Sequence, residues 1–289
     1  LGMSLRHLAE ALEQSWMSPL SLRTLLSRIH LLAEQATQPW PSQTPPIIQV
    51  DAIWVTLVQP TGGVYMDRKG RRRPRVGRFC RPIFVAMGVW PDTERTVVLD
   101  WSLGTSESER EWTAFLSHLE EQGLRSEEGL EPVIHDGGSG LCAALRTVHF
   151  AVPTQRCLVL KLRTIAQAIH LPEGLNRRQR SQKRKAILKH FREIWLAQRY
   201  ATALRRYLKV VRLLRVSQPD AVATLRRNFR HTVAFYQLPT SYDRRFLRTT
   251  SHLERFNRTL RTQFRKANAF HSLPGVRAAV AQQVSLFNA

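Results

Sequence analysis

One short, β-branched run with a single aspartate inside it reads Ile47-Ile48-Gln49-Val50-Asp51-Ala52-Ile53-Trp54-Val55. A run of this length and composition is typical of a buried β-strand. A carboxylate in a buried strand is costly unless it is paired with another group or binds a metal ion. The run therefore predicts a central strand and also a candidate metal ligand, Asp51.

Further elements follow this strand in an order that indicates the class of fold. Four more short apolar runs predict strands at residues 82–90, 96–101, 132–136 and 155–160. Periodic apolar positions predict one helix over residues 107–121 and another after Gly137-Gly138-Ser139-Gly140. Three strands in series, then helix, strand, helix and strand, predict a mixed α/β sheet, and this is also the strand order of the RNase H fold. Thr61-Gly62-Gly63 and a basic segment, Arg68 to Arg81, are expected to form a hairpin-like connection between the first two strands.

The segments on either side are helical in pattern. Residues 1–37 predict two amphipathic helices, which fit a helix-turn-helix and a plain helical hairpin equally well. Four prolines within residues 38–46 indicate a linker. Residues 47–160 are then the catalytic core, 161–240 a basic helical insertion, and 241–289 the C-terminal helices that complete the core. One helix is expected over residues 242–266, and because the chain begins at Leu1 rather than Met, we expect an upstream segment.

Positive charge is the strongest feature of the composition. The chain holds 44 Lys and Arg against 22 Asp and Glu, a formal net charge of +22. Residues 161–266 hold 27 of the basic residues and only 5 of the acidic ones, and Arg68 to Arg81 contains eight basic residues and no acid. A solvated basic protein would also be rich in such residues, but this segregation favours a surface that neutralises nucleic-acid phosphates.

Composition also excludes several classes of protein. No apolar run approaches the roughly 20 residues that a membrane-spanning helix needs. The cysteines, Cys80, Cys142 and Cys157, form no CxxC pair and no Cys/His ladder, so a structural zinc site or a disulfide framework is not expected. These patterns predict a cytoplasmic, nucleoid-associated protein with no membrane partner.

Two more carboxylates are candidates for chemistry. Asp136 ends the strand at residues 132–136, although an aspartate before Gly137-Gly138 also fits a simple turn cap. Glu254 is one of the few acids in the basic half, although a surface salt bridge with Arg258 would explain it as well. Together with Asp51, these residues lie on the first strand, the fourth strand and a late helix.

The sequence around Glu254 resembles a known family. The segment Thr249-Thr250-Ser251-His252-Leu253-Glu254-Arg255-Phe256-Asn257-Arg258-Thr259-Leu260-Arg261 is similar to the third-acid motif of Mutator-type insertion-sequence transposases. Val50-Asp51-Ala52 and Asp136-Gly137 resemble the first two acid motifs, and the long separation before Glu254 fits the helical insertion of that family. The resemblance covers most of residues 40–285. It implies an RNase H-like mixed sheet with a large all-helical insertion before the last catalytic helix.

The resemblance also implies a reaction and its partners. Asp51, Asp136 and Glu254 would bind two Mg²⁺ (or Mn²⁺) ions, with Asp51 as the bridging ligand, for strand cleavage and strand transfer of double-stranded DNA. The partners would be the transposon ends and the target, held by a homodimer or a larger assembly. Candidate DNA contacts are Arg71, Arg72, Arg73, Arg205, Arg206, Arg258, Arg261 and Trp195. For Trp195, packing in the core is the favoured alternative to stacking on a base.

One departure from the family keeps other functions open. The family carries Cys or Asp, two residues and then His after the fifth strand, whereas this chain has Cys157 followed by Leu160 in the position of the His. Cys157 is expected to be a buried small side chain without a catalytic role, and His135 and His252 to be packed. The alternatives are a catalytically inactive, transposase-derived DNA-binding protein, another RNase H-like nuclease, and a basic structural protein.

Overall fold

A mixed five-stranded sheet lies at the centre of the molecule. The computed structural model describes residues 24, 27–28, 31, 40–148, 152–238, 243–267 and 269–289, so the helices predicted for residues 1–37 lie almost entirely outside the described residues. Strands β1 (Ile47–Met66), β2 (Arg72–Trp90) and β3 (Arg95–Leu103) pair antiparallel, and β4 (Val133–His135) and β5 (Thr154–Arg156) run parallel to β1. The strand order is β3-β2-β1-β4-β5. The predicted mixed α/β architecture is confirmed.

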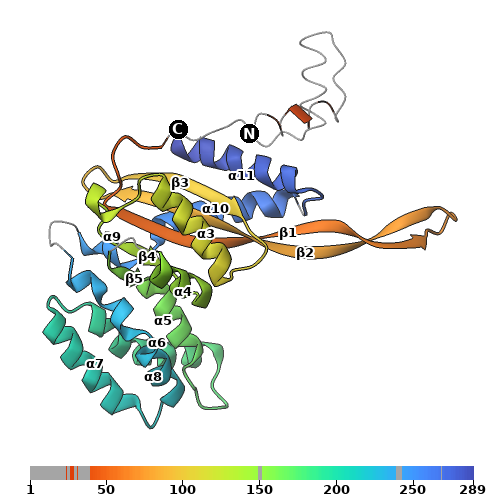
Figure 1. Cartoon of the computed structure of the whole chain (residues 1–289). Coiled ribbons are helices and arrows are strands. Elements are labelled where there is room, and N and C mark those ends of the chain that lie inside the picture. The colour runs from red at the N-terminus through yellow and green to blue at the C-terminus, as the bar shows by residue number, and fades with distance from the viewer. Residues whose placement is uncertain are drawn as a thin grey trace.

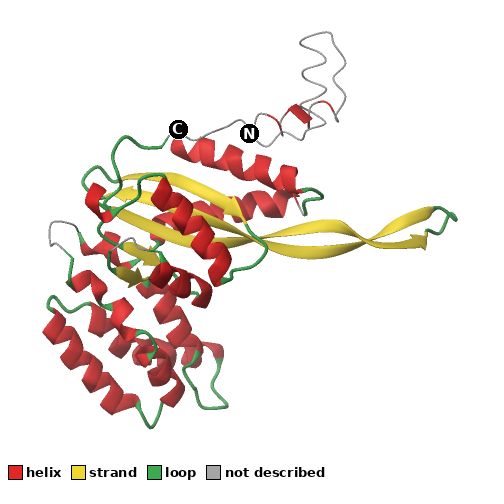
Figure 2. Ribbon diagram, viewed as in Figure 1, coloured by secondary structure: helices red, strands yellow, loops and turns green. Residues whose placement is uncertain are grey.

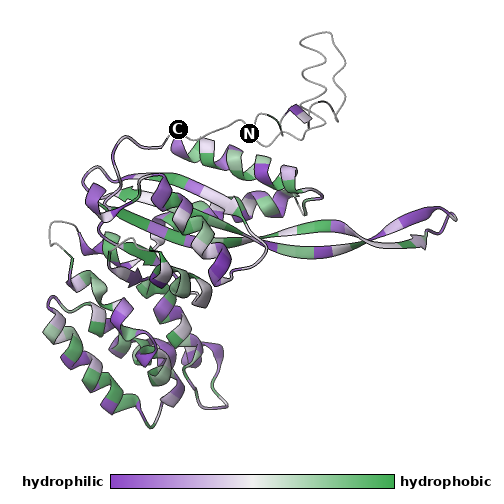
Figure 3. Cartoon of the chain, viewed as in Figure 1, coloured by the Kyte–Doolittle hydropathy of each residue, from purple (hydrophilic) through white to green (hydrophobic). Residues whose placement is uncertain are grey.

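Helices cover both faces of this sheet (Figure 2). Successive side chains of a strand point to opposite faces, so β1 contributes to the packing on both faces of the sheet. Ile48 and Val50 pack with α3 (Glu109–Glu121) and α4 (Ser139–Thr147). Ile53, Val55 and Leu57 pack with α10 (Ser251–Ala267) and α11 (Leu273–Asn288) on the other face. The apolar character of the central strands is visible in Figure 3.

A group of helices follows β5. It contains α5 (Leu158–Gln167), α6 (Arg177–Trp195), α7 (Tyr200–Leu214), α8 (Pro219–Arg226) and α9 (Arg244–Arg248), with short 3-10 turns at Phe229–Thr232 and Ala234–Tyr236. Another such turn, Ser126–Glu128, precedes β4. One core joins Phe191 and Leu225 of these helices to Ile47 and Ile134 of the sheet. The Lys161 ammonium donates to the carbonyl oxygens of Thr224 and Arg227, at 2.6 Å each, and ties α5 to the end of α8. No helix in the described part of the chain is long and apolar enough to cross a membrane.

Strands β1 and β2 are much longer than predicted. They continue past the sheet as a two-stranded ribbon, residues 58–78, which projects from the body of the molecule (Figure 1). A register shift between Pro60 and Val64, with Gly62 at φ +83°, accommodates the Thr61-Gly62-Gly63 segment. At the tip, the Asp67 carboxylate accepts hydrogen bonds from the backbone N–H groups of Lys69 and Arg71. The basic segment expected as a connection is therefore largely strand, because local pairing and turn bonds form it without a buried face.

Two other boundaries were predicted wrongly. The fifth strand ends at Arg156, and Leu158 already begins α5, so the apolar residues 158–160 lie on a helix. The helix expected over residues 242–266 is two helices, α9 and α10, with extended backbone at Thr249 between them. The Thr249 carbonyl accepts a hydrogen bond from the Gln49 side chain at 3.1 Å, a contact from β1 that helical periodicity does not encode.

Candidate active site

Asp51 and Asp136 come from neighbouring parallel strands. Val50 on β1 lies opposite His135 on β4, so Asp51 and Asp136 each follow one member of that pair. Burial, and after it the charge of Asp136, raises the pKa of Asp51 to about 7. Two carboxylates that repel each other in a partly buried place form a site where a cation is stabilising.

Both carboxylates have defined orientations. Asp51 Oδ1 accepts from the N–H of Ala52 at 2.9 Å, and Asp51 Oδ2 accepts from Asn257 Nδ2 at 2.9 Å. Asp136 Oδ1 accepts from the N–H of Gly138 at 2.8 Å, directly before α4. Asp136 thus caps the turn, as considered from the sequence. The cap uses Oδ1 and does not involve Oδ2.

Helix α10 carries Glu254 and is fixed to β1 by side chains. Gln49 is fully buried, and its Oε1 accepts from the N–H of Leu253 at 3.1 Å while its Nε2 holds the Thr249 carbonyl. Asn257, one turn after Glu254, holds Asp51. Glu254 Oε1 is buried and has no hydrogen-bond partner, and no salt bridge with Arg258 occurs in the described structure. An unpartnered carboxylate oxygen beside the helix face that contacts β1 needs a donor or a cation.

The three carboxylates are not gathered into one compact cluster. Among the described residues, no group of three or more His, Cys, Asp or Glu side chains is placed to hold a metal ion. The chemistry of the donors nevertheless fits a hard divalent cation, because all three supply carboxylate oxygens. The repulsion between Asp51 and Asp136 and the unpartnered Glu254 Oε1 fit such a cation as well.

Several side chains around the site have roles that the sequence did not indicate. Asn257 was part of the quoted motif without a function, and the polarity of Gln49 inside an apolar strand was the available signal for a buried hydrogen-bonding residue. Arg156 Nε donates to the Asp136 carbonyl at 3.1 Å and lies against Gly137, where a Cβ atom would be 2.3 Å from that nitrogen. Glu107 accepts a hydrogen bond from the Trp54 side chain, and burial raises the pKa of its carboxyl.

The predicted DNA contacts lie in different surroundings. At the ribbon tip Arg71, Arg72 and Arg73 are all exposed. Arg71 and Arg73 form salt bridges with Asp67. Arg206 donates to the Glu193 carbonyl at 2.6 Å, and Arg205 is exposed on α7. The two arginines predicted on α10, at positions 258 and 261, are also exposed.

Trp195 does not face solvent. Its side chain is 3% exposed, and its indole N–H donates to Thr232 Oγ1 at 3.1 Å. In this structure Trp195 is packed in the core, as the favoured alternative expected, and its ring is not available to stack on a base. The reason is that α6 turns this face toward the core shared with α8 and α9.

The remaining sequence candidates are packed. His135 is buried, and this burial lowers its pKa to about 3, so it is neutral. His252 stacks on Phe246 with ring centroids 5.6 Å apart. Cys157 is fully buried at the start of α5, as expected, and Leu160 is partly exposed one turn later.

Comparison with known proteins gives a consistent group of relatives. The family described as "Transposase, Mutator family" matches residues 67–286. The transposase for insertion sequence element IS406 of Burkholderia multivorans is 30% identical over 209 residues, 72% of this chain and 50% of that protein. The transposase for insertion sequence element IST2 of Acidithiobacillus ferrooxidans is 32% identical over 184 residues, 64% of this chain and 57% of that protein. The chain thus spans about half the length of the curated relatives it matches.

A solved structure shows a weaker likeness. The Drosophila P element transposase strand transfer complex aligns with a TM-score of 0.47 and 9% sequence identity, over 99% of this chain and 92% of that chain. A likeness at this level does not establish a common fold.

Proposed function

Because this chain belongs to the Mutator family of transposases, we propose that it cuts and joins DNA at the ends of an insertion sequence through Asp51, Asp136 and Glu254. The observation that carries this proposal is the attachment of α10 to β1. Gln49 and Asn257 hold the helix of Glu254 against the strand of Asp51, while β4 brings Asp136 beside it. Two acids on or directly after neighbouring strands and one on the helix attached to β1 thus come from parts of the chain that pack together.

The sheet order supports an RNase H-like core. We infer that residues 47–160 form this core, that 161–240 are a helical insertion, and that 241–289 return to complete it. Three antiparallel strands followed by two parallel ones fit that fold, and α10 and α11 cover the face opposite α3 and α4. The helices from α5 to α8 lie between β5 and the returning segment.

Two Mg²⁺ or Mn²⁺ ions would be held by Asp51, Asp136 and Glu254. When bound, such ions activate the attacking oxygen and stabilise the leaving 3′-oxygen in phosphoryl transfer. The chain itself orients the ligands: the Ala52 N–H and the Asn257 amide fix Asp51, and the Gly138 N–H fixes Asp136. Arg156, bonded to the Asp136 carbonyl, adds a positive charge where a DNA phosphate would approach.

Metal-dependent cleavage is the direct test of this function. A duplex carrying the terminal repeats of the element should be nicked by the protein with Mg²⁺ and left intact with EDTA, because the carboxylates alone supply no Lewis acid. The products are measured on a denaturing gel. DNA binding without cleavage in either Mg²⁺ or Mn²⁺ would favour the inactive DNA-binding protein, for which Leu160 is the sequence argument.

We also propose that the ribbon binds double-stranded DNA. The ribbon, residues 58–78, holds seven basic side chains, and an antiparallel two-stranded ribbon is narrow enough to enter the major groove. Arg71 and Arg73 are positioned by Asp67, while Arg72, Arg75 and Arg78 are exposed along β2. Transposon ends and target are the proposed duplexes, held by a homodimer or a larger assembly.

Removing ribbon arginines should weaken binding and its dependence on salt. The triple variant Arg72→Ala, Arg75→Ala and Arg78→Ala is expected to lower duplex affinity at least about tenfold and the salt slope by roughly 2–3, because each phosphate contact contributes about 0.9. Fluorescence anisotropy over a range of salt concentrations measures both. A control triple at exposed arginines outside the ribbon, Arg110, Arg146 and Arg277, should change them less. Equal effects of the two triples would mean that the ribbon has no special part in binding.

A further inference from the structure

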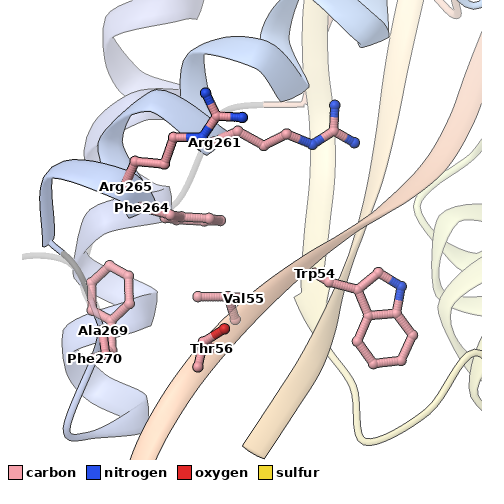
Figure 4. A pocket seen from close by; sticks show the side chains of 8 residues that line it. All are labelled: Trp54, Val55, Thr56, Arg261, Phe264, Arg265, Ala269 and Phe270. Carbon is pink, nitrogen blue, oxygen red and sulfur yellow. The ribbon is translucent and has the colours of Figure 1, made fainter. Parts of the chain in front are cut away.

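A pocket opens at the edge of β1 that follows Asp51, beginning at Trp54. β4 pairs with β1 only from Ile48 to Val50, and the next neighbour on this edge is Phe270, opposite Leu57. Between these points no described strand pairs with β1 on this side. The pocket has a volume of about 230 Å³ and is lined by Trp54, Val55, Thr56, Arg261, Phe264, Arg265, Ala269 and Phe270 (Figure 4).

The backbone of β1 faces into this gap. The Ile48 N–H donates to the Pro132 carbonyl and the Val58 N–H donates to the Phe270 carbonyl, so even-numbered residues direct their polar groups toward this edge. Trp54 therefore presents its N–H and carbonyl to the pocket. Its indole points away from Phe264 and Phe270 in Figure 4, and it is held by Glu107.

The side chains that line the pocket form an apolar side and a basic side. Val55, Phe264 and Phe270 form an apolar side, in which the two rings meet edge to face with centroids 5.6 Å apart. Arg261 and Arg265, both exposed on α10, form a basic side, and neither makes a salt bridge among the described residues. No acid lines the pocket. The matching ligand has an anionic part and a flat, apolar part.

The position of the pocket near Asp51 favours a nucleotide over other ligands with an anionic part and a flat, apolar part. Arg261 lies one turn after Asn257 on α10, and the Asn257 amide donates to Asp51, so the pocket lies next to Asp51 along the contact between α10 and β1. DNA bound at those carboxylates supplies phosphates to the arginines, but a base reaches the apolar side only when it has left its base pair. The volume is below the roughly 300 Å³ of ordinary small-molecule sites and suits a single base.

We propose that this pocket receives one unpaired nucleotide of the DNA strand held at Asp51. Its base lies against Val55, Phe264 and Phe270, and its phosphate lies between Arg261 and Arg265. This inference rests on the proposed function, because the DNA must first be bound at the carboxylates. It adds that the duplex is opened beside the position of cleavage.

The test compares two duplexes of the same sequence around one probe. One carries a single unpaired 2-aminopurine at the terminal-repeat junction, and in the other the 2-aminopurine is paired with thymine. We expect the protein to bind the unpaired duplex about tenfold more tightly, since stacking of one base on aromatic side chains supplies this much. Anisotropy gives the two affinities, and 2-aminopurine emission reports the surroundings of the base.

A variant that fills the pocket separates base capture from general DNA affinity. Ala269→Phe places a ring in the pocket and leaves both arginines, so it should abolish the preference and retain affinity for the paired duplex. Ala267→Phe, at the exposed end of α10 and outside the lining, is the matched control and should keep the preference. Arg261→Gln with Arg265→Gln gives a second variant, expected to lose the preference even if Ala269→Phe does not fold.

The outcomes distinguish this inference from the proposed function. Equal affinity of the wild-type protein for both duplexes, or a preference that survives Ala269→Phe in a folded protein, would overturn the pocket as a nucleotide site. Metal-dependent cleavage of the paired duplex would still support the transposase function in that case. Failure of the wild-type protein to bind either duplex would overturn both.

Discussion

Asp51→Asn is expected to reduce metal-dependent strand cleavage about a thousandfold or more while DNA affinity changes little. Replacing even an outer partner of a metal ligand commonly costs 10–100-fold, so the loss of a ligand itself should cost more. The change keeps the shape of the side chain and removes its charge. Cleavage is measured in single turnover with Mg²⁺, and binding by anisotropy without metal.

The stability of the same variant separates catalysis from folding. Burial and Asp136 raise the pKa of Asp51 to about 7, above its unfolded value, so the native state holds this charge at a cost once the pH exceeds 7. The stability that protonated Asp51 contributes is fully present below the unfolded pKa of 3.8 and is lost as the pH rises from there through 7. At pH 8 Asp51→Asn should therefore melt no lower than the wild type.

Controls complete the experiment on the carboxylates. Asp136→Asn and Glu254→Gln should show the same loss of cleavage, whereas Asp92→Asn, in an exposed turn after β2, should not. Cleavage at wild-type rates by all three site variants would contradict the assignment of these residues to the reaction.

Gln49→Leu is expected to have the second largest effect, on both folding and activity. Leucine fills a similar volume but leaves the Thr249 carbonyl and the Leu253 N–H without partners in a buried place. Each such group costs about 1–3 kcal/mol, so the loss of two should lower the free energy of unfolding by about 2–6 kcal/mol. Cleavage should also fall at temperatures where the variant remains folded, because the start of α10, and Glu254 with it, loses its attachment to β1.

Denaturant unfolding monitored by circular dichroism measures this loss of stability. The appropriate control is Gln263→Leu, at a partly exposed position on α10 whose side chain makes no hydrogen bond among the described residues. An unchanged unfolding midpoint for Gln49→Leu would show that the two hydrogen bonds do not hold α10.

The local sequence pattern was sufficient to predict most strands of the sheet. β-branched runs located the strands that contain Val50, Val85 and Ile134, and their order predicted the mixed α/β class. The motif around Glu254 predicted the Mutator family, which the comparisons confirm. In each case the signal lies within a few neighbouring residues, so the prediction can be made without knowledge of the tertiary structure.

Features that depend on contacts between residues distant in the chain could not be predicted from the local sequence. The break between α9 and α10 depends on Gln49, two hundred positions away in the chain. The burial of Trp195 depends on Thr232, which helical periodicity does not place beside it. The length of the ribbon depends on pairing between strands whose outer residues have no buried face. The assignment of metal ions to Asp51, Asp136 and Glu254 stays a prediction.

The continuity of β1 sets the length of DNA that the proposed binding would cover. Asp51 and Met66 lie on one strand, and at about 3.3 Å per residue the ribbon tip is roughly 45–50 Å from the carboxylate. Along B-form DNA, with about 3.4 Å per base pair, this span equals roughly 13–15 base pairs. A duplex that contacts both Asp51 and the ribbon tip would therefore extend more than one helical turn beyond the position of cleavage.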